Sequence, residues 1–139
     1  MVLVSLLVLL PILSQIENYH FLYDNLFFIL ISLYLFKHSF FIRYSFFARI
    51  QWVKILFFFL CIPIIFKTVE KINYFITYID ENTFESLFPG RGIQAIERMG
   101  NYIYTEMLFF GTLALVITLY FAYRMIVSTW RFRNKGVVI

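Results

Sequence analysis

Few side chains in this chain could do chemistry, since its 139 residues include one cysteine and two histidines. Cys61 lies in the apolar stretch FFLCIPI without a nearby histidine, and a thiol in apolar surroundings is inert because its reactive thiolate is disfavoured. His20 and His38 flank an apolar segment, so we expect them on opposite sides of a membrane, where they cannot share one metal. The sequence therefore predicts no catalytic, cofactor or metal site, and we expect a protein that is not an enzyme.

Longer motifs point the same way. The sequence contains no His-x-x-x-His, no Cys-x-x-Cys and no glycine-rich phosphate loop. Its one Gly-x-Gly, Gly90–Arg91–Gly92, follows a proline and is typical of a turn. An ion-coupled transporter usually carries an ionisable group deep in the bilayer. The nearest carboxylate, Glu106, borders the last apolar segment, so we expect it at the membrane interface.

The composition is that of an integral membrane protein. Hydrophobic residues make up 62% of the chain and charged residues 14%, and the mean hydropathy is +0.81. Soluble domains are about 45–50% apolar and about 25% charged. A soluble domain and a disordered chain are both excluded, and the single cysteine excludes a disulfide scaffold. The predicted fold class is all-α, a polytopic membrane protein that forms a single membrane domain.

Four apolar segments approach the roughly 20 residues, range about 17–25, that cross a hydrocarbon core of about 30 Å. The predicted membrane-spanning segments are 2–16, 25–42, 50–66 and 107–123. The last is the clearest, because Glu106 and Arg124 bracket 17 uncharged residues. Lys54 lies one turn inside the third segment, and we expect its ammonium to reach the headgroups.

The first segment could instead be a secretory signal, because it is short and contains Pro11. No lysine or arginine precedes it, and no pattern of small residues for cleavage follows it. These features favour an uncleaved membrane span over residues 2–16.

Charge is distributed unevenly over the connections. The second connection and the tail hold eight of the 12 Lys and Arg residues and none of the eight Asp and Glu residues. Because basic residues of short loops stay in the cytoplasm, both termini are predicted to be cytoplasmic, which requires an even number of spans. The 19 Phe and 10 Tyr beside 5 Gly and 3 Pro indicate an AT-rich gene. We expect a bacterial cytoplasmic membrane, or alternatively a mitochondrial inner membrane.

The connection 67–106 is predicted to form a helical hairpin outside the cytoplasm. Apolar residues recur at helical spacing on both sides of a turn at Pro89–Gly90. They are Val69, Ile72, Ile76 and Ile79 before the turn, and Ile93, Ile96, Gly100, Ile103 and Met107 after it. On this hairpin Arg91, Glu97 and Arg98 form either an ordinary solvated face or a docking surface for an extracytoplasmic partner.

Small residues recur on one face of the last span at Gly111, Ala114, Thr118 and Ala122. Such faces let membrane helices approach closely. The contact could be with another span of this chain or with a partner subunit, and both alternatives stay open. The basic cytoplasmic tail 124–139 is predicted to contact anionic lipid of the inner leaflet. The residues concerned are Trp130, Arg131, Arg133 and Lys135.

These features favour a non-catalytic accessory or structural subunit of a larger secretion, transport or respiratory complex. Its expected partners are the lipid bilayer and other integral membrane subunits, with no nucleic acid. One alternative is a small oligomeric transporter or flippase, with a polar path over Ser32, Thr112 and Thr118. A second is an enzyme acting on lipid head groups, which would need Asp24, His20 and the outer acids to converge.

Overall fold

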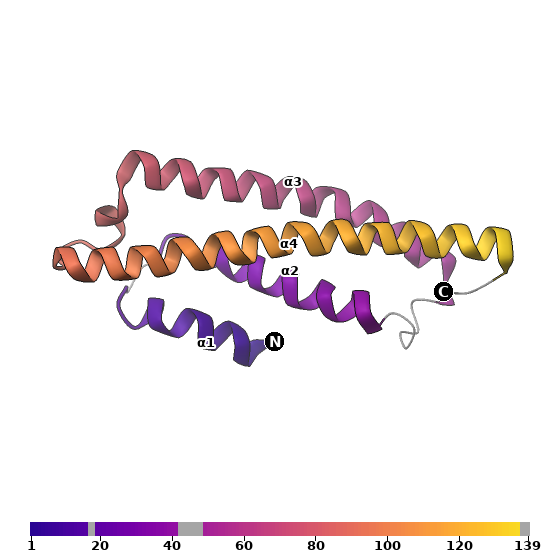
Figure 1. Cartoon of the computed structure of the whole chain (residues 1–139), viewed down its shortest axis with the longest axis horizontal. Helices are drawn as coiled ribbons and strands as arrows, with labels where there is room; N and C mark the ends of the chain where they lie inside the picture. Colours follow the sequence, from indigo (N-terminus) through magenta and orange to yellow (C-terminus); the bar gives the residue numbers. More distant parts are fainter. Residues whose placement is uncertain (17–18, 42–48, 137–139) are drawn as a thin grey trace.

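The backbone of this protein is helical. The computed structural model describes residues 1–16, 19–41 and 49–136, and no β-strand occurs within these ranges. The elements are α1 (Val2–Leu13), α2 (Leu22–Phe41), α3 (Gln51–Asn82), the short 3-10 helix η3 (Phe84–Leu87) and α4 (Ile93–Lys135) (Figure 1). The all-α prediction is confirmed.

Helix α4 is the axis on which the other helices are assembled. Its 43 residues extend about 65 Å at a rise of 1.5 Å per residue. Helix α2 runs alongside α4 in the same direction, and α3 runs alongside it in the opposite direction (Figure 1). The helix ends at Gly136, whose positive φ of 64° lets its amide bond back to the Phe132 carbonyl.

Length and apolarity divide the helices into two groups. In the part of the chain that the structure describes, α3 and α4 are the two helices long and apolar enough to cross a membrane. The 20 residues of α2 have the length, but Asp24, Lys37 and His38 lower its apolarity. The 12 residues of α1 extend about 18 Å, which is short of a hydrocarbon core of about 30 Å.

Helix α1 flanks only part of α4. Tyr102 Oη donates a hydrogen bond to the Val8 carbonyl at 2.9 Å. The Arg91 guanidinium donates one to the Gln15 carbonyl at 3.1 Å. In the view of Figure 1 the N-terminus is level with the middle of α4, and α4 continues well beyond it. A complete crossing by residues 2–16 therefore stays a prediction.

The small-residue face of α4 is inside the bundle. Gly111, Ala114, Thr118 and Ala122 are all buried. A Cβ atom built at Gly111 would lie 2.9 Å from Ile72 Cγ1 of α3 and 3.4 Å from Phe28 Cε2 of α2. The packing role predicted for this face is therefore one within the chain. A partner helix would have to contact another face of α4.

The turn that joins α3 to α4 is held by a close contact. Thr83 ends α3 with a positive φ of 60°, and Gly90 adopts a positive φ of 78°. Between them η3 lays the Phe84 ring over Gly100 of α4, where a Cβ atom would come within 2.6 Å of the ring. Residues 67–82 thus belong to α3 and residues 93–106 to α4, and the turn that contains η3 joins the two helices.

Replacing Gly100 with alanine is expected to detach Phe84 from α4, because the new methyl group takes the space of the ring. Strain of this kind costs about 1–3 kcal/mol, and limited proteolysis at residues 83–92 should accelerate. Gly92→Ala is the matched control, since a Cβ atom at Gly92 meets nothing within 4 Å. Equal cleavage of the two variants would contradict the close packing at Gly100.

Candidate functional site

A band of polar side chains crosses the bundle where α2 begins. It contains residues of three helices, and we call it the polar belt. Its members are Asp24 and Asn25 of α2, Lys67, Glu70 and Lys71 of α3, and Glu106 of α4. Asn25 and Glu106 form its buried part, and the remaining four form its more exposed part.

The buried part is a hydrogen bond inside an apolar bundle. Asn25 Nδ2 donates to Glu106 Oε2 at 2.5 Å, and the two residues are 0% and 7% exposed. Each keeps a buried oxygen, Asn25 Oδ1 and Glu106 Oε1, without a hydrogen-bond partner among the described residues. Glu106 therefore lies inside the bundle, on the side of α4 that α2 covers, and its position at the membrane interface stays a prediction.

Tyr19 adds a hydroxyl to this buried group. Its oxygen is also buried and has no hydrogen-bond partner among the residues that the structure covers. Burial raises the pKa of Tyr19 well above its usual range; the nearby Asn25 side chain opposes the rise, and the charges of Glu106 and Asp24 add to it. Unsatisfied buried polar atoms are rare. Tyr19 Oη, Asn25 Oδ1 and Glu106 Oε1 are three such atoms in this one group.

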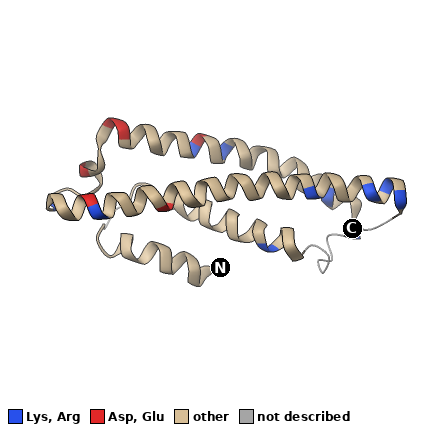
Figure 2. Cartoon of the chain, in the orientation of Figure 1, with Lys and Arg blue, Asp and Glu red and all other residues tan. Residues whose placement is uncertain are grey.

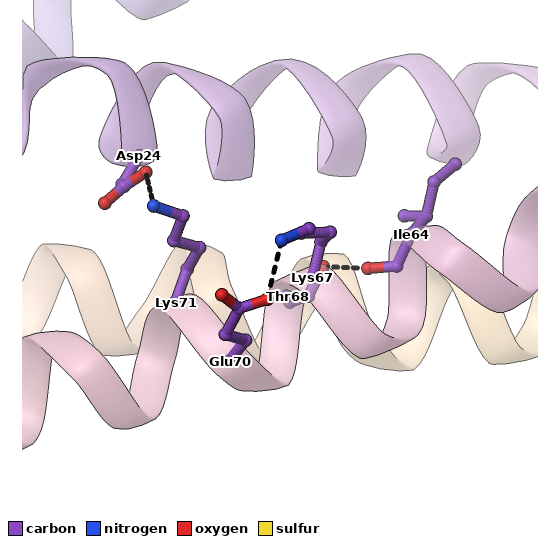
Figure 3. Close-up of polar contacts among 6 residues, drawn as sticks. All are labelled: Asp24, Ile64, Lys67, Thr68, Glu70 and Lys71. Atoms are coloured by element: carbon purple, nitrogen blue, oxygen red, sulfur yellow. Dashed lines mark hydrogen bonds and ion pairs between the residues drawn. The ribbon is translucent and has the colours of Figure 1, made fainter.

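The exposed part consists of two ion pairs between charged residues. Lys71 Nζ lies 3.3 Å from Asp24 Oδ1 and ties α3 to α2. Lys67 Nζ lies 2.8 Å from Glu70 Oε2 on the next turn of α3 (Figure 3). The Lys67 and Glu70 side chains are 62% and 59% exposed, so this second pair faces outward from the bundle.

The register of α3 against α4 places the ion pairs beside the uncharged run of α4, whereas the sequence predicted them beyond its end. Ile72 lies against Gly111, and the rings of Phe75 and Tyr104 are 6.0 Å apart. At equal rise along the two helices, Lys67 lies opposite the part of α4 between Thr112 and Val116. This level is well inside the uncharged run 107–123, and Figure 2 shows the charges midway along α3.

The sequence prediction treated Lys67 and Glu106 as the outer ends of adjacent spans. The register corrects this interpretation, because Lys67 is level with the interior of the last span. The outer boundaries of segments 50–66 and 107–123 therefore do not lie in one plane.

His20 lies just before α2 and His38 lies in its last turn, so the length of the helix separates the two histidines. His20 Nε2 is 3.1 Å from Tyr74 Oη, whereas His38 Nδ1 is 2.9 Å from the Tyr34 carbonyl oxygen. No group of three potential metal-ligating side chains occurs within residues 1–16, 19–41 and 49–136.

The convergence expected for a lipid head-group enzyme is partial. Asp24 and His20 both contact α3, through Lys71 and Tyr74. The outer acid Asp80 lies nine residues beyond Lys71, about 14 Å along the helix axis. Asp24 is therefore paired with Lys71, and not with a second carboxylate as the enzyme alternative requires.

Lys54 also differs from expectation. Its Nζ donates to Ser128 Oγ of α4 at 2.8 Å, and the residue is 1% exposed. The side chain turns inward to α4, whereas the sequence predicted an ammonium that extends away from the bundle. A hydroxyl on the facing helix supplies a polar contact that the local sequence does not reveal.

The hydroxyls of the predicted polar path do not form one. Ser32 Oγ donates to the Phe28 carbonyl, and Thr118 Oγ1 donates to the Ala114 carbonyl, both at 2.6 Å. These bonds are local to each helix, and Thr112 is exposed on another face. The path over Ser32, Thr112 and Thr118 is therefore not continuous.

The remaining predicted residues lie at the two ends of the bundle. Arg91, Glu97 and Arg98 are exposed near the turn before α4 and in its first turns. At the opposite end of α4 the side chains of Trp130, Arg131, Arg133 and Lys135 are exposed. The structure thus keeps the predicted docking residues and the predicted lipid-contact residues on separate surfaces.

Sequence reasoning missed the Asn25–Glu106 bond. Each residue stands at the edge of an apolar segment, where a polar side chain is ordinary, and 81 positions separate them. Comparison of the chain with family models, with curated proteins and with solved structures found no match.

Proposed function

We propose that this protein is a non-catalytic structural subunit of a larger membrane complex, and that the face of α3 carrying Lys67 and Glu70 contacts a polar surface of a partner subunit. The observation that carries the proposal is the exposed Lys67–Glu70 ion pair, 2.8 Å long, at the level of the uncharged run of α4.

Lys54 and Lys67 are too close together along α3 for both side chains to lie outside a bilayer of ordinary thickness. Between Lys54 and Lys67 the helix has 12 uncharged residues, which extend about 18 Å. A hydrocarbon core is about 30 Å thick. A bilayer that covers the uncharged run of α4 therefore also covers Lys67 and Glu70 on α3.

Exposed charges at that level are costly in lipid, even when they pair with each other. A partner subunit that presents polar groups would replace the lost hydration. Outward-facing charges of this kind are ordinary at a subunit contact and unfavourable on a lipid-facing helix. The face thus supports a role in assembly.

A photo-crosslinking amino acid at Phe66, which is 72% exposed beside this pair, tests the proposal in intact membranes. We expect crosslinks to another membrane protein from this position. Val116 of α4, 57% exposed at a similar level, is the control and should crosslink chiefly to lipid. The charge reversal Glu70→Lys should abolish the protein crosslink, whereas Glu97→Lys at the exposed start of α4 should preserve it.

Two outcomes would overturn the assembly role. One is lipid-only crosslinking from both positions. The other is purification of the chain in mild detergent as a lone, monodisperse monomer, since a subunit should bring its partners.

The same proposal includes the topology. Crossings at 50–66 and 107–123 are supported by α3 and α4, and a crossing at 25–42 by the 20-residue length of α2. The charge contrast between the two ends of the bundle (Figure 2) supports a cytoplasmic C-terminus. The proposed membrane is the bacterial cytoplasmic membrane, with the mitochondrial inner membrane as the alternative. Arg91, Glu97 and Arg98 then offer a second contact surface outside the cytoplasm.

The buried Asn25–Glu106 pair favours a second candidate, a small oligomeric transporter. A carboxyl group with one free oxygen inside the bundle could carry a proton or a small cation. Crosslinks from Phe66 to a second copy of this chain, in place of another protein, would favour that candidate.

A further inference from the structure

We infer that a groove between α3 and α4, at the basic end of the bundle, binds an anionic phospholipid. The groove is open on one side and has a volume of about 260 Å³. Its apolar walls include Ile55 and Phe58 of α3 and Ile126 of α4, and the polar lining includes Lys54, Trp130 and Arg133.

The walls of the groove suit an acyl chain. Helices α3 and α4 each contribute aliphatic or aromatic side chains, and Trp130 lies at the rim with 58% of its surface exposed. Indole rings prefer the headgroup level, where one face is apolar and the N–H reaches water. The groove therefore combines apolar walls with a residue typical of the membrane surface.

The charges suit the anionic headgroup of such a lipid. Lys54 and Arg133 contribute positive charge from two different helices. The hydrogen bond from Lys54 Nζ to Ser128 Oγ, at 2.8 Å, holds the lysine beside α4. No Asp or Glu occurs in residues 25–66 or 107–139, so carboxylates of these segments do not neutralise the site. Basic pockets between membrane helices on the cytoplasmic side recognise anionic headgroups.

A lipid fits this site better than a soluble anion does. A free phosphate would use the two cations and leave the apolar walls unused. A zwitterionic phospholipid would use the walls, but its headgroup has no net charge to complement Lys54 and Arg133. An anionic phospholipid would use both the apolar walls and the two cations.

The two tryptophans of the chain permit a direct test. Trp52 is 81% exposed, and the replacement Trp52→Phe leaves Trp130 as the single fluorophore. The full chain is reconstituted in phosphatidylcholine vesicles that contain a small fraction of brominated phosphatidylglycerol or, separately, brominated phosphatidylcholine. Bromine quenches only a nearby indole. We expect half-maximal quenching at a several-fold lower fraction of the anionic lipid.

Arg131 provides a matched control for Arg133. Two successive steps of 100° put the two side chains on different sides of α4, and Arg131 does not line the groove. Arg133→Gln should lower the preference for phosphatidylglycerol about fivefold, the usual contribution of one cation near an anionic surface. Arg131→Gln should retain most of the preference for phosphatidylglycerol.

Lys54→Gln supplies a second variant within the groove and should also lower the preference. Its folding must be verified by circular dichroism, because Lys54 is buried. Equal quenching by the two lipids before any charge is removed would overturn the inference. Equal losses in Arg131→Gln and Arg133→Gln would also overturn it, because they indicate diffuse surface charge. The test needs no partner subunit, so its failure is distinguishable from failure of the assembly role.

Discussion

Replacing Gly111 and Ala114 together with leucine is expected to break the packing of α2 and α3 on α4. A Cβ atom at Gly111 already comes within 2.9 Å of Ile72 Cγ1, and Ala114 is 0% exposed. Overpacking costs about 1–3 kcal/mol for each substitution, so the pair should lose about 2–6 kcal/mol. Thermal unfolding in detergent, followed by circular dichroism, measures the loss.

The matched control is Thr112→Leu with Val116→Leu, which adds leucines to exposed positions of the same helix. This control should change the unfolding temperature little. If instead the Gly111/Ala114 variant unfolds normally and only loses a co-purifying protein, the small-residue face binds a partner and the packing described above is wrong.

Glu106→Ala is expected to have the second large effect. It removes the acceptor of the 2.5 Å bond from Asn25 and leaves the Asn25 amide buried and unsatisfied. An unsatisfied buried donor costs about 1–3 kcal/mol, and the vacated volume adds to this loss. Glu106→Gln retains an acceptor oxygen without the charge, so its stability should remain near that of the natural chain. The unfolding temperatures of both variants report the difference.

Glu97→Ala is the control for this pair, because it removes an exposed carboxylate from the same helix and should be nearly neutral. Equal destabilisation by Glu106→Gln and Glu106→Ala would contradict the expectation. It would mean that the carboxyl group itself is required, as in a bound cation or an ion pair with a partner.

Much of the fold was predictable from local patterns. The uncharged run 107–123 lies within α4, and segment 50–66 lies within α3 except for its first residue, because apolarity and helical spacing are properties of neighbouring residues. The turn at Pro89–Gly90 was predicted for the same reason. The four small residues that their spacing singles out, from Gly111 to Ala122, are buried in the structure.

Local patterns were less informative about which face of α3 is buried. The sequence favoured a face through Val69, Ile72 and Ile76. In the structure Val69 is 40% exposed, while Thr68 and Phe75 are fully covered. The predicted helical periodicity of α3 is therefore correct, but its buried face is rotated about the helix axis. The rotation arises because packing against α4 and α2 determines which face of α3 is buried.

The sequence by itself determined the helices, their apolar character and the gathering of basic residues at one end. Only the tertiary structure decided the register of α3 on α4, and with it the level of Lys67 and Glu70, the inward turn of Lys54 and the bond between Asn25 and Glu106. The physical reason is the separation along the chain over which each effect acts. Hydropathy and helical period act over a few residues, whereas register is set by close contacts such as Ile72 on Gly111, between residues that lie far apart in the chain.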